Sequence, residues 1–442
     1  MNSTEKLYWS DAHATAFETR GASLGTHGGT PSLVLCETLF YPEGGGQLGD
    51  LGTLTLGTHA VRIRDTQVED GVIHHVIDGV LEPALAELLG RGDQATDLPV
   101  RGAVDEARRR DNMVQHTAQH ALSRALANAA RADTVSARLG AASCTIDVGK
   151  PGLSDADLHR AEDLVNAVVM SDVAVVTSFP SAEELAKLDL RKQPNAEKSA
   201  AGVRIVSIEG FDLTPCGGTH CTRTGQIGQI RIVATEKYKG MLRITFHAGA
   251  RALADARSRH GVLAALAADL TCGAADIPTA VAKLRTEAKG LRDKLDAART
   301  ELAELVARGL RDALPASAGP HVVPIARPLD DLAGLRTLAA ELTRDPRVVA
   351  LVTGGTGGTG GTGGAGGALV TGGASPDESS GEVVLVIQRG AEAKLDCGAF
   401  VQAQAKVRSG RGGGRPERAE GRFPRGTSLE ALAKAAAEAL RG

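Results

Sequence analysis

The chain has 442 residues, of which 50 are Lys or Arg and 53 are Asp or Glu, giving a net charge of −3. This length predicts two to four domains, and the near-neutral charge excludes a broadly basic protein while leaving room for a local basic patch. Six cysteines scattered over so long a chain exclude a small disulfide framework. The N-terminus lacks a signal-like apolar run, and no stretch of about 18 apolar residues predicts a membrane span. We therefore expect a cytoplasmic protein with reduced thiols and no membrane partner.

Residues 1–100 have the pattern of a β-rich domain. The segments SLVLCETLFYP, HAVRIRDTQV and VIHHVI predict strands, and turn residues are densest at residues 42–47. Short antiparallel strands must bury one face, so we expect a small β-barrel or sandwich.

Residues 101–248 predict a domain that mixes helices and strands. Residues 105–130 form a helix by composition, with Met113, Leu122 and Leu126 on one face. A second helix is predicted over residues 154–170, where Ser154 can cap the start. Strands at CTIDV, VAVVTSFP, VRIVSIEG, IGQIRIVATE and MLRITFHAG complete the pattern. The fold class we expect is α+β.

Residues 249–316 are almost purely helix-forming and predict an arm that joins two domains. A stripe of apolar residues repeats along it amid dense charges: Val281, Leu284, Leu291, Leu295, Leu302 and Leu305. This pattern is typical of an exposed helical hairpin or short coiled coil. The arm, or the domain after it, could pair two chains into a homodimer.

Residues 317–442 predict a compact α/β domain. Residues 353–374 interrupt it with a Gly/Thr-rich run, which favours a disordered, flexible insertion because it offers little apolar surface to bury. The run lacks the Lys-Ser/Thr end that a phosphate-binding loop requires.

Two pairs of side chains are candidate metal ligands. His116 and His120 are spaced by four on the predicted helix, which puts both imidazoles on one face. Cys216 and His220 flank a Gly-Gly-Thr turn, and together the four match the nitrogen and sulfur preference of Zn²⁺. Thr117 follows His116, where the metalloprotease pattern HExxH has glutamate, which argues against peptide hydrolysis. The residue types alone leave structural and functional zinc equally open.

A glycine-rich loop follows the first predicted strands. Residues 41–50 read YPEGGGQLGD, in which three glycines permit close approach to a ligand and Gln47 offers a donor and an acceptor. An ordinary hairpin loop explains the same residues, and both interpretations remain open at this point.

The order of FYPEGGGQLGD, HTAQH, CGGTH and TGQIG resembles the editing domain of alanyl-tRNA synthetase. It resembles still more closely the long form of the free-standing AlaX-type alanyl-tRNA editing proteins. The resemblance implies that the His116, His120, Cys216 and His220 set binds one zinc ion, and that Gln47 helps to hold substrate or position water. It also implies that a hydroxyl in DTVSARLG recognises a seryl group. The candidates for that role are Thr134 and Ser136, next to Arg138, which departs from the histidine or aromatic residue usual in the family.

The segment at residues 410–419 resembles the glycine-rich signature of the synthetase's C-terminal domain. Basic residues cluster here: Lys406, Arg408, Arg411, Arg415, Arg418, Arg422 and Arg425. Clustered arginines among flexible glycines suit phosphate contacts, so Arg408, Arg411, Arg415 and Arg418 are our candidates for tRNA binding. A solvated charged loop is the alternative.

We expect four domains, at residues 1–100, 101–248, 249–316 and 317–442. The function implied is trans-editing: hydrolysis of mischarged seryl-tRNA(Ala), with glycyl-tRNA(Ala) as a further candidate, and no aminoacylation, because ATP-dependent activation motifs are not apparent. The alternatives are a non-catalytic RNA-binding protein with a structural zinc and a zinc hydrolase of small molecules.

Overall fold

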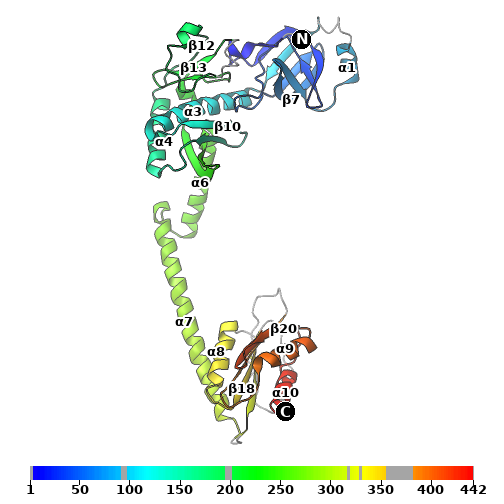
Figure 1. Cartoon of the computed structure of the whole chain (residues 1–442), viewed down its shortest axis with the longest axis vertical. Coiled ribbons are helices and arrows are strands. Elements are labelled where there is room, and N and C mark those ends of the chain that lie inside the picture. Colours follow the sequence, from blue (N-terminus) through cyan, green and yellow to red (C-terminus); the bar gives the residue numbers. More distant parts are fainter. Residues whose placement is uncertain are drawn as a thin grey trace. The chain divides into compact units, whose positions relative to one another are not determined.

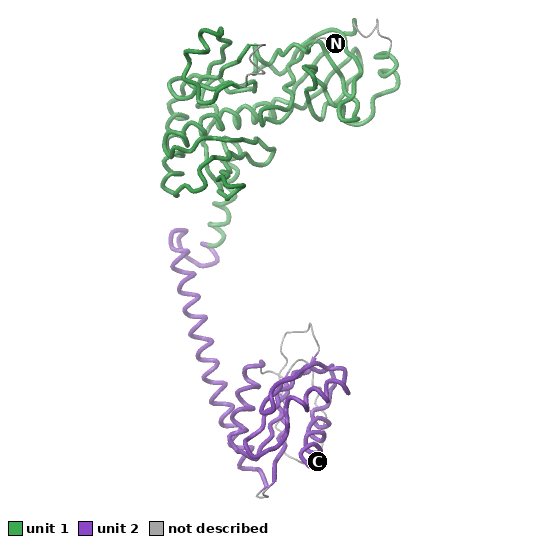
Figure 2. The backbone as a smooth tube through the Cα atoms, viewed as in Figure 1, with its two compact units in different colours: residues 1–266 green, residues 267–442 purple. Residues whose placement is uncertain are grey.

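The structure is a computed structural model that describes residues 3–90, 97–194, 202–315, 319–327, 331–354 and 382–441. The chain divides into two compact units, residues 1–266 and 267–442 (Figures 1 and 2). Both units combine helices with sheets, which confirms the predicted α+β class. The expected boundary at residue 316 lies inside the second unit and those at 100 and 248 inside the first, so the four-domain division stays a prediction.

The first unit begins with a seven-stranded antiparallel sheet in the order β2-β9-β6-β7-β8-β4-β3. Its strands are β2 Ala16–Arg20, β3 Ser23–His27, β4 Thr30–Val34, β6 Gly52–Leu56, β7 His59–Glu69, β8 Val72–Ile77 and β9 Pro99–Val104. Leu33, Leu54 and Leu56 are fully buried on its inner side. Within the described residues β2 and β3 are the edges and do not pair with each other, so we describe an open sheet where we expected a barrel.

Short elements flank this sheet. They are β1 Glu5–Lys6, which pairs in parallel with β5 Glu37–Thr38, the 3₁₀ turn η1 Leu7–Trp9, and helix α1 Pro83–Leu89. The glycine-rich loop runs from β5 to β6. It therefore connects the two-stranded β1–β5 sheet to the seven-stranded sheet.

Helix α3, Glu106–Ala130, is the central element of the first unit. Its start is capped by Asp105, whose side chain accepts from the Arg108 backbone N–H. Leu122 and Leu126 are fully buried in a core shared with Ile244 and Phe246. The elements around it are strands β10 Thr134–Leu139, β11 Cys144–Val148, β15 Ile230–Tyr238 and β16 Met241–Ala248, and helix α4 Asp155–Met170. Ser154 and Asp157 form a capping box on α4, at the helix start that the sequence predicted.

A small three-stranded sheet completes the first unit. Its antiparallel strands are β12 Val175–Ser178, β13 Ile205–Ile208 and β14 Asp212–Pro215, accompanied by α5 Ala182–Leu185 and η3 Thr224–Ile227. Strand β14 ends at Pro215, so the turn that follows starts with Cys216.

The predicted arm is helical. It contains α6 Gly249–Asp269, η4 Ala274–Asp276 and α7 Ile277–Asp312. The predicted apolar stripe on α7 is exposed, from 37% at Val281 to 67% at Leu291, and pairing of two chains through it stays a prediction. Within the described ranges no single helix is long and apolar enough to cross a membrane. The bent pair Gly249–Asp269 and Ala274–Asp312 meets that test only when taken together.

The second unit is built on a five-stranded sheet in the order β17-β18-β19-β21-β20. Its elements are β17 His321–Ala326, α8 Leu332–Leu342, β18 Val348–Gly354, β19 Val383–Arg389, α9 Cys397–Val407, β20 Arg411–Gly414, β21 Arg418–Phe423 and α10 Leu429–Ala439. Of the predicted insertion at 353–374, Thr353 and Gly354 end β18, and the remainder lies outside the described residues.

The glycine-rich signature at residues 410–419, whose glycines we expected to be flexible, forms an antiparallel hairpin of β20 and β21 that packs against α9. The glycines allow backbones to approach closely. A Cβ at Gly412 would lie 2.3 Å from the carbonyl oxygen of Glu420, and one at Gly414 would lie 2.4 Å from the Cα of Ala419. The glycines of this segment therefore serve the packing of the hairpin, and its arginines flank them.

Candidate metal centre

The structure brings the four predicted ligands together. Helix α3 supplies the two histidines, and the turn after β14 supplies the other pair. One donor atom from each residue lies within 4.8 Å of all the others: His116, His120, Cys216 and His220. The Sγ of Cys216 lies 3.4 Å from Nε2 of His116 and 3.3 Å from Nε2 of His220. Such a cluster of one sulfur and three nitrogens could hold a metal ion.

The turn that carries Cys216 fits against α3 only because Gly218 has no side chain. A Cβ at that position would lie 2.3 Å from Cε1 of His116. The backbone N–H of Gly218 also points to the Cys216 Sγ at 3.4 Å. The buried guanidinium of Arg204 donates to the carbonyl oxygens of Cys216 at 2.9 Å and Gly218 at 2.8 Å. These contacts hold the sulfur in place before any ion arrives.

Gln47 fixes the tautomer of His116. Its Oε1 accepts from the backbone N–H of Thr219 at 3.2 Å, and its Nε2 donates to the Thr219 hydroxyl at 2.9 Å. The same Oε1 lies 2.7 Å from Nδ1 of His116, which must therefore donate. The lone pair of His116 is left on Nε2, the atom that faces Cys216.

The other two imidazoles are oriented in the same sense. The Thr117 hydroxyl donates to the carbonyl oxygen of Met113 at 2.8 Å, so it accepts from Nδ1 of His220 at 3.3 Å. Nδ1 of His120 lies 3.7 Å from Oδ2 of the buried Asp212 carboxylate, which is beyond hydrogen-bond distance. All three rings thus turn Nε2 toward the cluster, as partners behind metal-binding histidines commonly arrange.

The protonation states of the four residues suit a metal cation that replaces the proton of the Cys216 thiol. Burial, together with the neighbouring imidazoles and Arg204, lowers the pKa of His116 and His220, which keeps both rings neutral and able to ligate. Burial lowers the pKa of His120 to about 3. Burial raises the pKa of the Cys216 thiol, opposed by the Gly218 N–H and Arg204. Metal binding there would release the thiol proton.

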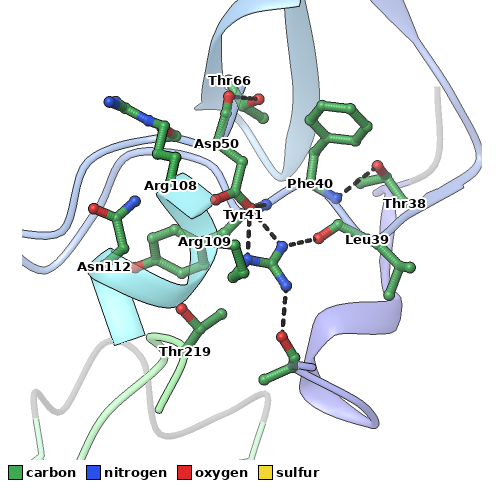
Figure 3. Close-up of polar contacts among 12 residues, drawn as sticks. Thr38, Leu39, Phe40, Tyr41, Asp50, Thr66, Arg108, Arg109, Asn112 and Thr219 are labelled. Atoms are coloured by element: carbon green, nitrogen blue, oxygen red, sulfur yellow. Dashed lines mark hydrogen bonds and ion pairs between the residues drawn. The ribbon is translucent and has the colours of Figure 1, made fainter. Parts of the chain in front are cut away.

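A buried ion pair anchors the glycine-rich loop to α3 (Figure 3). Nε of Arg109 donates to Oδ2 of Asp50 at 3.0 Å, and its Nη1 donates to the carbonyl oxygen of Ala12 at 2.7 Å. The same Asp50 oxygen accepts from the backbone N–H of Tyr41 at 2.7 Å. Both ends of the loop are therefore tied to the helix that carries His116, which places Gln47 behind that ring.

The two hydroxyl candidates lie in different surroundings. The Thr134 hydroxyl donates to Oγ of Ser123 on α3 at 2.8 Å, and Ser123 also accepts from Gln119, the neighbour of His120. The Ser136 hydroxyl instead donates to Asp147 at 2.8 Å, away from α3. Thr134 thus reaches the ligand helix and Ser136 does not. Arg138, on the same strand, is exposed.

The arginine candidates lie in the second unit. Arg411, Arg415 and Arg418 are exposed on the β20–β21 hairpin, whereas Arg408 at the end of α9 is half-buried. Arg411 pairs with Glu382 at 3.0 Å. The hairpin therefore carries a local basic patch, of which Arg415 and Arg418 occupy the turn.

Several residues around the cluster carry no signal in the sequence that marks them. Asp212 and Arg204 are polar residues of ordinary appearance, and Thr219 stands out only as part of the CGGTH motif, so the contacts of all three are evident only in the fold. Thr117 did stand out, but as the residue that replaces a glutamate. Its position between the two histidines is the one hint that it touches a ligand.

Comparison with known proteins finds two matching families. Residues 203–245, which contain Cys216 and His220, match the "Threonyl and Alanyl tRNA synthetase second additional domain" family. Residues 13–87, which contain Gln47, match the "tRNA synthetases class II (A)" family. Gln47 and the Cys216–His220 pair therefore lie in two separate segments that are both similar to tRNA synthetases.

Curated relatives include alanine–tRNA ligases of archaea. The ligase of Halobacterium salinarum is 33% identical over 318 residues, which are 69% of this chain and 32% of that protein. The ligase of Methanothrix thermoacetophila is 29% identical over 415 residues, covering 93% of this chain and 42% of that protein. The chain thus spans about a third to two fifths of these relatives. The solved C-Ala domain of Aquifex aeolicus alanyl-tRNA synthetase is 19% identical, with a TM-score of 0.21, covering 29% of this chain and 97% of that domain.

Proposed function

We propose that this chain, an alanyl-tRNA synthetase-like protein with segments similar to its editing and C-terminal domains, hydrolyses the ester between tRNA(Ala) and a wrongly attached amino acid. Serine is the amino acid we expect first, and glycine is the second candidate. The observation that carries the proposal is the convergence of His116, His120, Cys216 and His220 on one point, with hydrogen-bond partners behind the rings of His116 and His220.

We assign zinc as the metal. One thiolate sulfur and three imidazole nitrogens are donors that zinc prefers. Four ligands also match the tetrahedral coordination usual for zinc in proteins. Hydrogen bonds to Nδ1 orient the rings of His116 and His220. Because the histidines are uncharged, the Cys216 thiolate would be the single anionic ligand. A zinc ion bound there would supply a positive charge beside the oxyanion that ester hydrolysis develops.

We assign Gln47 a positioning role. The sequence resemblance implied that Gln47 holds substrate or positions water. Its side chain is fully buried, and its amide is occupied by His116 and Thr219. A group with no exposed atom acts through the ligand it orients.

We assign the choice of serine over alanine to Thr134. A site that hydrogen-bonds a substrate hydroxyl rejects the analogue that lacks it far more strongly than an apolar pocket rejects an added hydroxyl. The half-buried Thr134 hydroxyl is bonded to Ser123 on the ligand helix, where a seryl hydroxyl could join the same network. Phosphate contacts we assign to the exposed arginines of the β20–β21 hairpin.

One deacylation panel tests the proposal. Seryl, glycyl and alanyl esters on the same tRNA(Ala) are incubated with the full chain, with and without prior removal of metal by a chelator. We expect rapid loss of the seryl ester, slow loss of the alanyl ester, and no hydrolysis after chelation. Equal rates on seryl and alanyl esters would defeat the selectivity, and full activity after verified metal removal would defeat the metal role.

A second candidate is a structural metal in an RNA-binding protein without catalysis. It is favoured by the four protein ligands, since a closed tetrahedral site offers no position to water. This candidate predicts tRNA binding with no hydrolysis of any ester in the same panel.

A further inference from the structure

Four aromatic side chains form a continuous row beside the metal-binding turn. Ring centroids are 5.3 Å apart from Tyr41 to Tyr8, 6.3 Å from Tyr8 to Trp9, and 5.7 Å from Trp9 to Phe179. The sequence contains one tryptophan and three tyrosines, and aromatics make up only 2% of it. A protein so poor in aromatics has gathered its tryptophan and two of its tyrosines at one place.

The inner end of the row is fixed. Tyr8 is 2% exposed and Tyr41 is 5% exposed. The Tyr41 hydroxyl donates to the carbonyl oxygen of Gly44 in the glycine-rich loop at 2.8 Å. Trp9 donates from Nε1 to the carbonyl oxygen of Gly217 at 3.1 Å, in the turn between two of the metal ligands. The indole is thereby held against the site that we assign to ester hydrolysis.

The outer end of the row is open to solvent. Phe179, which follows β12, is 54% exposed, so packing alone does not account for its position against Trp9. The ammonium of Lys6 lies 4.3 Å from the centroid of the Trp9 ring. The N-terminal segment, blue in Figure 1, approaches the β12–β13 sheet here. A half-buried ring and an exposed ring with an adjacent cation form the kind of arrangement that stacks unpaired bases and attracts the phosphates between them.

We infer that Trp9 and Phe179 stack on the unpaired bases at the 3′ end of the RNA substrate and that Lys6 attracts its backbone phosphate. The inference rests on the proposed function, because an ester on the terminal ribose places the terminal base on the same sugar as the reacting group. Trp9 touches the turn that carries Cys216, so a base held there leaves the ester beside the cluster. The cation favours RNA over an apolar peptide as the occupant.

The single tryptophan makes the test direct, since all indole fluorescence comes from Trp9. The metal-loaded full chain is titrated with the trinucleotide CCA, the common 3′ end of tRNA, and with an apolar peptide of similar size. We expect saturable quenching by CCA that weakens with added salt, and none by the peptide. A fluorescence that stays unchanged up to millimolar CCA, or that responds only to the peptide, would overturn the inference.

Three variants separate stacking from folding. Phe179→Ala should bind CCA on the order of ten-fold more weakly, with Phe179→Tyr restoring the affinity, because stacking tolerates any aromatic ring. Met170→Ala removes another exposed apolar side chain of the same unit, 79% exposed, and should bind as the unaltered chain does. Equal affinity of Phe179→Ala and the unaltered chain would contradict the proposal.

The hydrolysis assay distinguishes this inference from the proposed function. Phe179→Ala should raise KM for the seryl ester on the order of ten-fold with kcat nearly unchanged, as loss of uniform binding does. Quenching that depends on Phe179, in a protein that hydrolyses no ester, would support the base site and refute the esterase. Hydrolysis with an unaltered KM in Phe179→Ala would support the esterase and refute the base site.

Discussion

The carboxylate of Asp50 and the guanidinium of Arg109 form an ion pair inside the first unit, with side-chain exposures of 0% and 2%. The pair joins the glycine-rich loop, which carries Gln47, to helix α3, which carries the candidate ligand His116. Removing one partner of such a pair leaves the other charge buried and unpaired.

Arg109→Met should lower the free energy of unfolding by about 3–5 kcal/mol for this reason, measured by urea denaturation followed by circular dichroism. The double variant with Asp50→Asn should recover part of the loss. The neighbouring exposed Arg110→Met is the matched control and should change stability little. A loss in Arg109→Met no greater than that in Arg110→Met would contradict the anchoring role.

Cys216→Ala should lose the metal and the hydrolytic activity together, because it removes the anionic donor of the set. Metal content per chain, measured by elemental analysis after dialysis, checks the first effect. Cys221→Ala serves as the control, since this buried thiol lies outside the cluster and should keep a full complement of metal. Full metal in Cys216→Ala would remove the thiol from the ligand set.

Gln47→Leu should weaken metal binding by about 10- to 100-fold, measured by competition with a chelating dye. The leucine cannot accept from Nδ1 of His116 or from the Thr219 N–H, so two buried donors lose their partner. Gln47→Glu keeps both acceptor contacts and should bind metal more tightly than Gln47→Leu. Identical affinities in the two variants would show that Gln47 does not act through His116.

Thr134→Val should lower the ratio of seryl to alanyl hydrolysis by roughly ten-fold or more, because a methyl group replaces the hydroxyl that the network requires. The ratio is measured with both esters on the same tRNA(Ala). Ser136→Ala is the control, since its hydroxyl is bonded to Asp147 rather than to α3. A ratio that falls in Ser136→Ala and not in Thr134→Val would reverse the assignment.

Acid should destabilise the N-terminal sheet through His75. Burial lowers the pKa of His75 from the ordinary 6.5 to about 4, and its ring is bonded to Thr38 and the Leu33 carbonyl. Above pH 6.5 the ring is neutral in both states, so this contribution to stability is fully present. As the pH falls from 6.5 toward 4 the unfolded chain takes up a proton that the folded chain refuses, so stability falls by ~3 kcal/mol and then levels off.

His75→Gln should flatten this pH dependence, because the amide does not titrate in that range. Unfolding free energies at several pH values between 4 and 7 give the slope, which is compared with that of the exposed His159→Gln. An unchanged slope in His75→Gln would mean that other groups dominate the acid response.

The sequence predicted those parts of the protein whose signals are local. Helix α4 was predicted with Ser154 as its N-terminal cap, and the structure has a capping box there. The ligand cluster was predicted because each half is a pair spaced by four residues. Joining the halves rested on zinc's preference for their donors and on the resemblance to the editing domain.

Features that depend on distant contacts could not be predicted in this way. Gln47 and Thr219 are 172 residues apart, and although both lie in motifs that resemble the editing domain, neither motif indicates that the two side chains hydrogen-bond to each other. The glycines of residues 410–414 look flexible in sequence, but they allow strand β20 to pack closely against β21 and α9. The same composition serves a loop or a tight interface, and only the neighbouring backbone decides between them.

Gly218 sets how far the ligand cluster can adapt. Its hydrogen occupies the space where any larger substituent would strike the His116 ring, and a Cβ there would also lie 3.0 Å from Oε1 of Gln47. The backbone of the turn at Gly218 therefore packs directly against the His116 ring of α3. No flexible side chain lies between these two groups that could move aside. An ion of larger radius would have to separate two rigid segments, so we expect the centre to discriminate among metals by size as well as by chemical affinity.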